Sequence, residues 1–168
     1  MISINDLVQT RPYSAVRDSI EVDPLREVDA LQEAQLLDSR VCNLTSTAAL
    51  LFELRTSLQF EVGNSALLVV RGLRSFDWKS SAKHVPLTAL TVVSSVPDRL
   101  GESFCARFAF FPDAHLAVAG DLAEFYVLEL EGIGDVPPDY SNADLKQVQD
   151  ALPSWSSACS LLQMSISR

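Results

Sequence analysis

Histidine and cysteine are scarce in this chain of 168 residues. The two histidines, His84 and His115, are too few for a zinc site built on several imidazoles. The three cysteines, Cys42, Cys105 and Cys159, lie far apart in the sequence and form no CxxC pair. An odd number of isolated thiols is typical of reduced cysteines in a cytoplasmic protein, so we expect no disulfide framework and no metal site.

Long hydrophobic runs are also missing, and the N-terminus lacks the basic and apolar regions of a signal peptide. We therefore expect a cytoplasmic protein with no membrane partner. Basic residues are in deficit, because 13 Lys and Arg face 22 Asp and Glu, and the net charge is −9. Affinity for phosphates depends on Lys and Arg, so nucleic acid is excluded as an expected partner. An acidic chain suits a basic protein partner or a cation, and the simplest role of the charge is solubility.

Motifs for catalysis and for cofactor binding are missing as well. Gly132 and Gly134 match part of a dinucleotide-binding loop, but Pro137 stands where the third glycine is needed. No lysine follows them as it does in a phosphate-binding loop, and the nearby acids do not have EF-hand spacing. We therefore predict that the protein is not an enzyme and that it holds no cofactor and no metal.

The chain does contain the pattern of an antiparallel sheet. Apolar and polar residues alternate over 50–62, which predicts a half-buried strand with Glu53 and Arg55 on its solvent face. A turn leads from it into a second predicted strand over 66–79, with a candidate bulge at Gly72. Further strands are predicted at 87–95, 103–111, 115–119 and 123–131, with a weaker one at 36–46.

Two helices are expected outside these strands. The first covers residues 24–34, where Asp23 can cap the helix and an apolar stripe follows. The second lies within 141–152, with Ser141 or Asn142 as its cap and apolar residues at helical spacing. The C-terminal stretch after it, which contains a tryptophan, is expected to pack onto the body of the protein.

The fold predicted from these elements is a single α+β domain over residues 23–168, preceded by an N-terminal arm over 1–22. Its centre is a twisted antiparallel sheet of six to seven strands in meander order, with a helix near each end. The sheet is wide enough that closure into a small barrel is a further expectation.

Negative charge is concentrated toward both ends of the chain, since residues 1–38 hold eight acids and three bases and residues 113–168 hold nine acids and two bases. The stretch after the last predicted strand is rich in carboxylates and has one tyrosine that could anchor a partner. We predict a non-enzymatic protein-binding module that docks this acidic surface on a basic partner, for example an immunity or inhibitor protein that neutralises a toxin. A solvated loop is the simpler alternative. The candidate partner-binding residues are Glu129, Glu131, Asp135, Asp139, Tyr140 and Asp144.

Two further functions remain open at this stage. The apolar face of the sheet could bind a small molecule, as a carrier or an enzyme, with Arg74, Trp78 and His115 as candidate pocket residues. Alternatively, the protein could be a structural homo-oligomer joined through an exposed strand edge or through an uncovered part of the apolar face.

Overall fold

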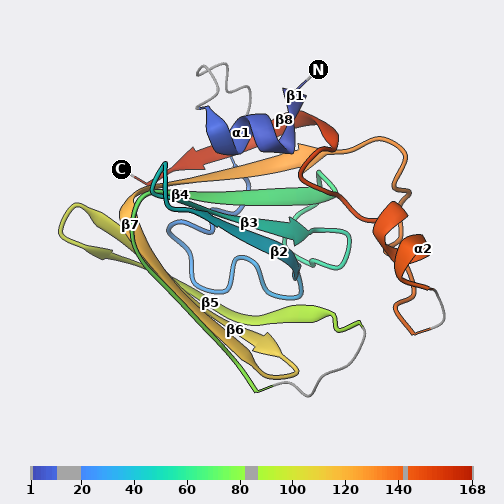
Figure 1. Cartoon of the computed structure of the whole chain (residues 1–168), viewed down its shortest axis with the longest axis horizontal. Coiled ribbons are helices and arrows are strands. Elements are labelled where there is room, and N and C mark those ends of the chain that lie inside the picture. Colours follow the sequence, from blue (N-terminus) through green and yellow to red (C-terminus); the bar gives the residue numbers. More distant parts are fainter. Residues whose placement is uncertain (1, 11–19, 82–86, 142–143, 168) are drawn as a thin grey trace.

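The computed structural model describes residues 2–10, 20–81, 87–141 and 144–167. Within them the chain is mostly β, with one antiparallel sheet of eight strands and two short helices (Figure 1). The elements are β1 (Ile2–Ser3), α1 (Ile4–Gln9), β2 (Gln35–Cys42), β3 (Thr47–Glu53), β4 (Ser65–Ser80), β5 (Leu90–Leu100), β6 (Ser103–Phe111), β7 (Ala114–Glu129), α2 (Leu145–Asp150) and β8 (Ala158–Ile166).

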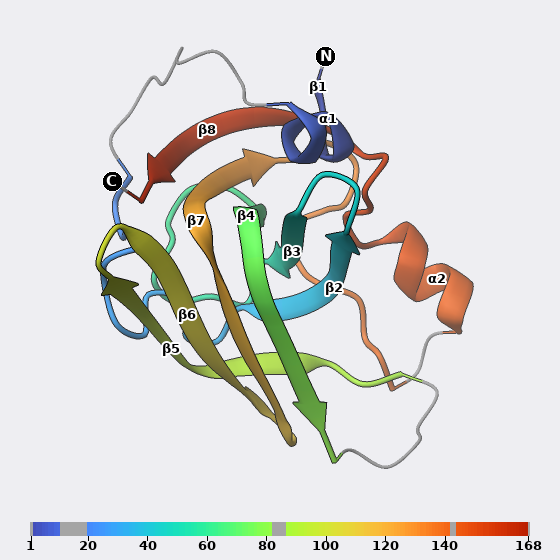
Figure 2. The same cartoon turned by 60° about the vertical axis from the view of Figure 1, so that its left-hand side comes forward.

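Two three-stranded meanders, β2–β3–β4 and β5–β6–β7, make up most of the sheet. Pairing of β4 with β7 and of β2 with β5 joins them, so a ring of backbone hydrogen bonds passes through six strands (Figure 2). β8 and then β1 are added outside the ring. The ring is not a barrel, because β2 and β5 meet in just two residue pairs of the described chain, at Gln35 and Leu36. The antiparallel sheet is confirmed, whereas a single meander and a barrel are wrong.

The central strands β3 and β4 are buried on both faces where they pair. Phe52 and Leu68 point into a core inside the ring, whereas Leu51 and Leu67 point into a second core outside it. All four are at most 2% exposed. The outer core is covered by α1 and by the C-terminal stretch with Trp155, which packs onto the body as predicted. The predicted alternation is confirmed here, but the expectation of a half-buried strand is wrong because both faces are covered.

The strand predicted over 50–62 is shorter than expected. β3 ends at Glu53, and residues 54–64 form the connection to β4. Two local hydrogen bonds turn the chain out of the sheet: the Arg55 N–H donates to the Glu53 carboxylate (2.8 Å), and the Ser57 N–H donates to the carbonyl of residue 54 (2.9 Å). Leu58, predicted to face inward, is 84% exposed.

Residues 24–34 do not form the predicted helix. The Asp23 carboxylate accepts a backbone hydrogen bond two residues later (3.0 Å), as a cap does, but only turns follow. Asp29 and Glu33 have φ values of +59° and +71°, which an α-helix cannot contain. Their N–H groups donate to carbonyls of β5 at 2.7 and 3.0 Å, so the segment follows the edge of β5, and the hydrogen bonds within it close single turns.

The strands predicted separately at 115–119 and 123–131 are one strand, because β7 runs through Gly120 and Asp121 between them. β7 pairs with β4 along its length, while its other edge pairs first with β6 and then with β8. A Cβ at Gly120 would lie 2.5 Å from Cγ1 of Val70, so glycine serves close packing here. The bulge predicted near Gly72 is confirmed, since the pairing with β7 shifts by one residue just after it.

Both ends of the chain contribute elements to the sheet. The predicted C-terminal helix is confirmed as α2, although Asp144 caps it, through a bond from the Gln147 N–H (2.9 Å). Strand β8 was not expected. At the other end, β1 pairs with β8, and Ile4 and Leu7 of α1 are fully buried. The expected cap Asn142 and the histidine at position 84 lie outside the described residues.

Candidate functional site

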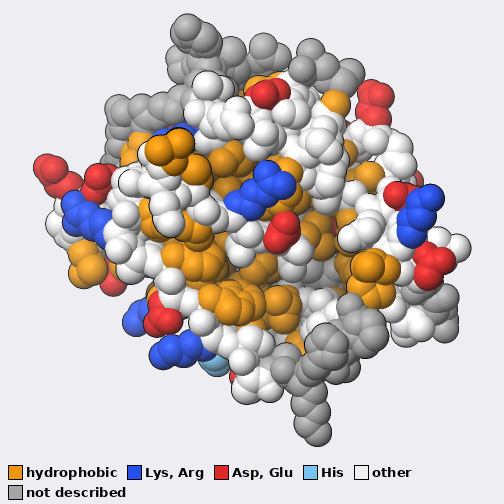
Figure 3. Space-filling view, in the orientation of Figure 1, with side chains coloured by type: hydrophobic (Ala, Val, Ile, Leu, Met, Phe, Trp, Pro, Cys, Tyr) orange, Lys and Arg blue, Asp and Glu red, His pale blue; other side chains and the backbone are white. Residues whose placement is uncertain are grey.

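The acidic segment, which we define as residues 129–144, runs from the end of β7 to the start of α2 (Figure 1). From residue 129 to residue 150 the chain has six carboxylates and a single lysine. All six carboxylate residues are exposed. Figure 3 shows acidic side chains on the α2 side of the molecule, next to an apolar area in the middle of the same face. This side carries the acidic segment that the sequence singled out.

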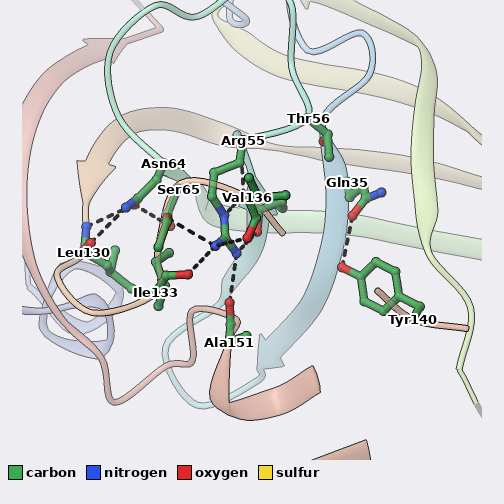
Figure 4. A network of polar contacts seen from close by, with 12 residues as sticks. Gln35, Arg55, Thr56, Asn64, Ser65, Leu130, Ile133, Val136, Tyr140 and Ala151 are labelled. Atoms are coloured by element: carbon green, nitrogen blue, oxygen red, sulfur yellow. Dashed lines mark hydrogen bonds and ion pairs between the residues drawn. The ribbon is translucent and has the colours of Figure 1, made fainter. Parts of the chain in front are cut away.

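Arg55 holds the acidic segment by its backbone (Figure 4). Its Nη1 group donates to the carbonyl oxygens of Ile133 (2.6 Å) and Val136 (3.1 Å). Its Nη2 group donates to the carbonyl of Ala151 (2.9 Å), just beyond α2. These acceptors lie before and after the Pro-Pro pair at 137–138, so one guanidinium ties both ends of the loop to the residues that follow β3.

Glu53 fixes the orientation of Arg55. Nε of Arg55 donates to Oε1 of Glu53 (2.8 Å) and Nη2 donates to Oε2 (2.5 Å), which is a bidentate pair. The two side chains are 0% and 3% exposed. A buried ion pair stabilises a fold only when further hydrogen bonds satisfy its remaining groups, and the loop carbonyls do this here. The prediction that both side chains lie on a solvent face is therefore wrong.

Asn64 anchors the start of the acidic segment in the same way. Its Nδ2 donates to the carbonyl of Leu130 (2.8 Å), and the N–H of Leu130 donates back to its Oδ1 (3.0 Å). This side chain is buried and forms the second part of the network in Figure 4. The carboxylates that follow Leu130 are thus carried on a loop whose backbone is fixed at both ends.

The candidate carboxylates differ in their local roles. Glu129, Glu131 and Asp135 are exposed to solvent. Asp139 is exposed as well, and its carboxylate accepts bonds from the N–H (2.9 Å) and the hydroxyl (2.6 Å) of Ser141. Asp144 is the α2 cap described above. The charges therefore remain accessible, while two of them also order the loop.

Tyr140 connects the loop to β2 and is not free to contact a partner with its hydroxyl group. Its hydroxyl donates to Oε1 of Gln35 in β2 (3.0 Å), and the ring is half-buried. Burial raises the pKa of the Tyr140 phenol, and the nearby charge of Glu53 adds to the rise. The phenol therefore stays neutral and donates its proton to the glutamine across the physiological pH range.

The three candidate pocket residues do not converge on one cavity. Arg74 is 64% exposed and pairs with Asp121 (2.7 Å), and His115 is 66% exposed. Trp78 projects to the inner side of the sheet, where its ring centroid lies 5.8 Å from that of Phe110. His115 points to the opposite face, because its neighbours along β7 are the buried, inward-facing residues.

A groove lies beside the acidic segment, and sequence analysis missed it. It has a volume of about 560 Å³ and runs between the outer face of β2–β3 and the end of α2. Leu37 and Trp155 line it, and Asp38 and Asp150 supply the acidic groups of its wall. The indole N–H of Trp155 donates to Oδ2 of Asp38 (2.7 Å), which fixes both side chains. The only signal in the sequence is Trp155 itself, because Asp38 and Trp155, which meet in the groove, are 117 positions apart.

A separate cavity of about 650 Å³ lies between α1 and the turn that joins β2 to β3. Cys42 lines it, and a hydrogen bond with the Thr45 hydroxyl lowers the pKa of the Cys42 thiol. Arg71 also lines the cavity, and its Nε forms a salt bridge with Oε2 of Glu124 (2.7 Å). The cavity therefore offers an accessible thiol of increased acidity, beside Arg71, which is already paired, and a second arginine, Arg40.

Comparison of the chain with protein-family models, with curated proteins and with solved structures finds no match. In the described part of the chain, no three His, Cys, Asp or Glu side chains group in a way that could hold a metal ion. None of the helices described here has the length and apolar character needed to cross a membrane. The acidic segment and its groove are accordingly assessed on their geometry alone.

Proposed function

We propose that this protein is a non-enzymatic, cytoplasmic protein-binding module that docks the acidic segment and the adjacent groove on a basic partner. The observation that carries the proposal is the clamp by Arg55, which presents exposed carboxylates on a loop fixed at both ends. A fixed loop loses little conformational entropy on binding, so more of the interaction energy appears as affinity.

The groove adds a place for an apolar side chain of the same partner. Its wall combines Leu37 and Trp155 with the carboxylates of Asp38 and Asp150. Interfaces commonly join an apolar or aromatic centre to a charged rim that steers the encounter. A partner segment with Arg or Lys around one apolar residue fits this chemistry. An immunity or inhibitor protein that covers a basic toxin surface is one concrete version of the proposal.

The inner face of the sheet supports docking over the alternative of an enclosed small-molecule site. Phe52 and Phe108 pack with their ring centroids 6.1 Å apart, and Phe60 and Phe125 pack at 6.0 Å. All four side chains are buried in the core inside the ring. Aromatic rings thus fill the space that a carrier would leave to its ligand.

Capture from the native cell lysate at low and then high salt tests the proposal. The variant E131Q/D135N removes two exposed charges, and E27Q/E102Q removes two exposed charges elsewhere as its matched control. Two rim charges are worth roughly 0.5–1 kcal/mol each, so E131Q/D135N should weaken capture by about 5–30-fold at low salt. Salt at about 0.5 M should release the partner, because exposed charges are then screened within a few ångströms.

Equal capture by E131Q/D135N and by wild type would remove the acidic segment from the interface. A partner retained unchanged at high salt would contradict electrostatic docking. Loss of capture by E27Q/E102Q to the same extent would show a nonspecific effect of net charge instead of a surface at this loop.

A further inference from the structure

The second half of β4 has a free edge. β3 pairs with β4 only from Ser65 to Arg71, whereas β7 pairs with the opposite edge as far as Ser80. Within the described residues, no strand pairs with positions 74–79 on the β3 side. Figure 2 shows this half of β4 extending past β3 with β7 alongside. A free edge of this length offers backbone N–H and C=O groups to another extended chain.

The hydrogen bonds to β7 identify which residues offer these groups. The Ser81 N–H donates to the carbonyl of Asp113 (3.3 Å) on the β7 side. Backbone groups of successive residues point to alternate sides of a strand, and the register of β4 with β7 is regular from residue 75 to residue 80. Asp77 and Lys79 therefore direct their backbone groups to β7, and Trp78 directs its own to the free edge.

The side chains along this edge have a self-complementary order. Trp78 stands in the middle and is 38% exposed. Asp77 and Lys79 flank it, 63% and 77% exposed, with their charged atoms a loose 3.9 Å apart. Charged side chains on an edge discourage pairing with unrelated strands. When two copies of this strand pair antiparallel about Trp78, the acid of each copy faces the base of the other.

We infer that the free edge of β4 pairs with the same edge of a second copy of this chain. The two strands run antiparallel, and Trp78 lies opposite Trp78 of the second copy. By the two-fold symmetry, Asp77 of each copy then lies opposite Lys79 of the other. Opposite charges on directly opposed residues stabilise a pair of strands, and like charges destabilise it. The dimer uses neither the acidic segment nor the groove, so it goes beyond the function proposed above.

Sedimentation velocity of the full chain tests this dimer at concentrations from about 10 μM to about 1 mM, the range expected for a small interface. The sedimentation coefficient of the wild type is expected to rise with concentration toward that of a dimer. The variants D77K and K79E each place like charges opposite one another at two positions, so each should weaken association by about tenfold or more. An equimolar mixture of the two variants should associate again, because every altered residue then faces an opposite charge.

Two control variants carry the same changes of charge at the end of β5 and in the turn that follows it. E102K matches D77K and R99E matches K79E, and both positions are exposed. Both controls should associate as the wild type does. A wild type that stays monomeric over the whole range would overturn the proposal. So would association of D77K or K79E alone at wild-type strength, or a mixture that remains monomeric while the wild type dimerises.

Discussion

The buried pair of Glu53 and Arg55 allows a sharp prediction about stability. Replacing Arg55 by methionine keeps much of the side-chain volume but leaves the Glu53 carboxylate, 0% exposed, without its cation. It also removes the donor from the carbonyls of Ile133, Val136 and Ala151. Breaking one partner out of a buried pair costs about 3–5 kcal/mol, because the remaining charge is uncompensated. We expect R55M to lose an amount in this range.

The matched comparison is an ion pair on the surface of the same sheet. Arg74 pairs with Asp121 at 2.7 Å, but the two side chains are 64% and 60% exposed. Exposed pairs contribute about 0–1 kcal/mol, so R74M should be close to neutral. The double variant E53L/R55M should lose less than R55M, since it leaves no buried charge behind.

Urea denaturation followed by circular dichroism measures these differences. With a slope of about 2 kcal/mol per molar urea, the midpoint of R55M should fall by roughly 2 M, while that of R74M should move by less than about 0.5 M. Equal losses in R55M and R74M would refute the reasoning. A double variant that is less stable than R55M would also refute it, because the penalty would then not come from the orphaned carboxylate.

Further predictions concern the thiols and a close contact in the sheet. Thiolates are the reactive form of cysteine, and the pKa of the Cys42 thiol is lowered whereas burial raises that of Cys159 to about 11. Iodoacetamide at about pH 7.5 should therefore label Cys42 before Cys159, and T45V should slow the labelling of Cys42 by raising its pKa. Peptide mass spectrometry measures both rates. Equal labelling rates for Cys42 and Cys159 would contradict the assignment. The variant G120A should lose roughly 1–3 kcal/mol in thermal unfolding, because its Cβ would lie 2.5 Å from a methyl group of Val70. An unchanged melting temperature for G120A would contradict this prediction, because β4 and β7 would then accommodate the added methyl group at no cost in stability.

Much of the sheet could be predicted from hydrophobic periodicity. β6 was expected over 103–111, and its buried positions Phe104, Phe108 and Phe110 are those of the predicted apolar face. Periodicity failed where one pattern has two physical causes. The alternation over 50–62 continues beyond the end of β3 at Glu53. There the chain turns out of the sheet, so alternating residues no longer point to opposite faces of a strand. Cap chemistry also misled at Asp23, since a cap begins one turn as readily as a helix.

The acidic residues of the candidate site were found from composition, but the device that holds them was not. Glu53 and Arg55 alternate with apolar residues, so periodicity assigns them to solvent, while tertiary contacts across about 80 positions bury them together. The groove likewise joins Asp38 to Trp155, which no local pattern connects. Local chemistry therefore located the charges, and long-range hydrogen bonds determined how they are presented.

Carboxyl footprinting of the captured complex tests the central claim most directly, that the clamped acidic segment is the surface that meets the partner. Exposed carboxylates are labelled by a carbodiimide and an amine, with and without the partner fraction released by high salt and then returned to low salt. The account predicts that labelling of Glu131 and Asp135 falls several-fold in the complex, while labelling of Glu27 and Glu102 is unchanged. Protection of Glu27 or Glu102 with Glu131 and Asp135 still fully labelled would place the interface elsewhere and contradict the account.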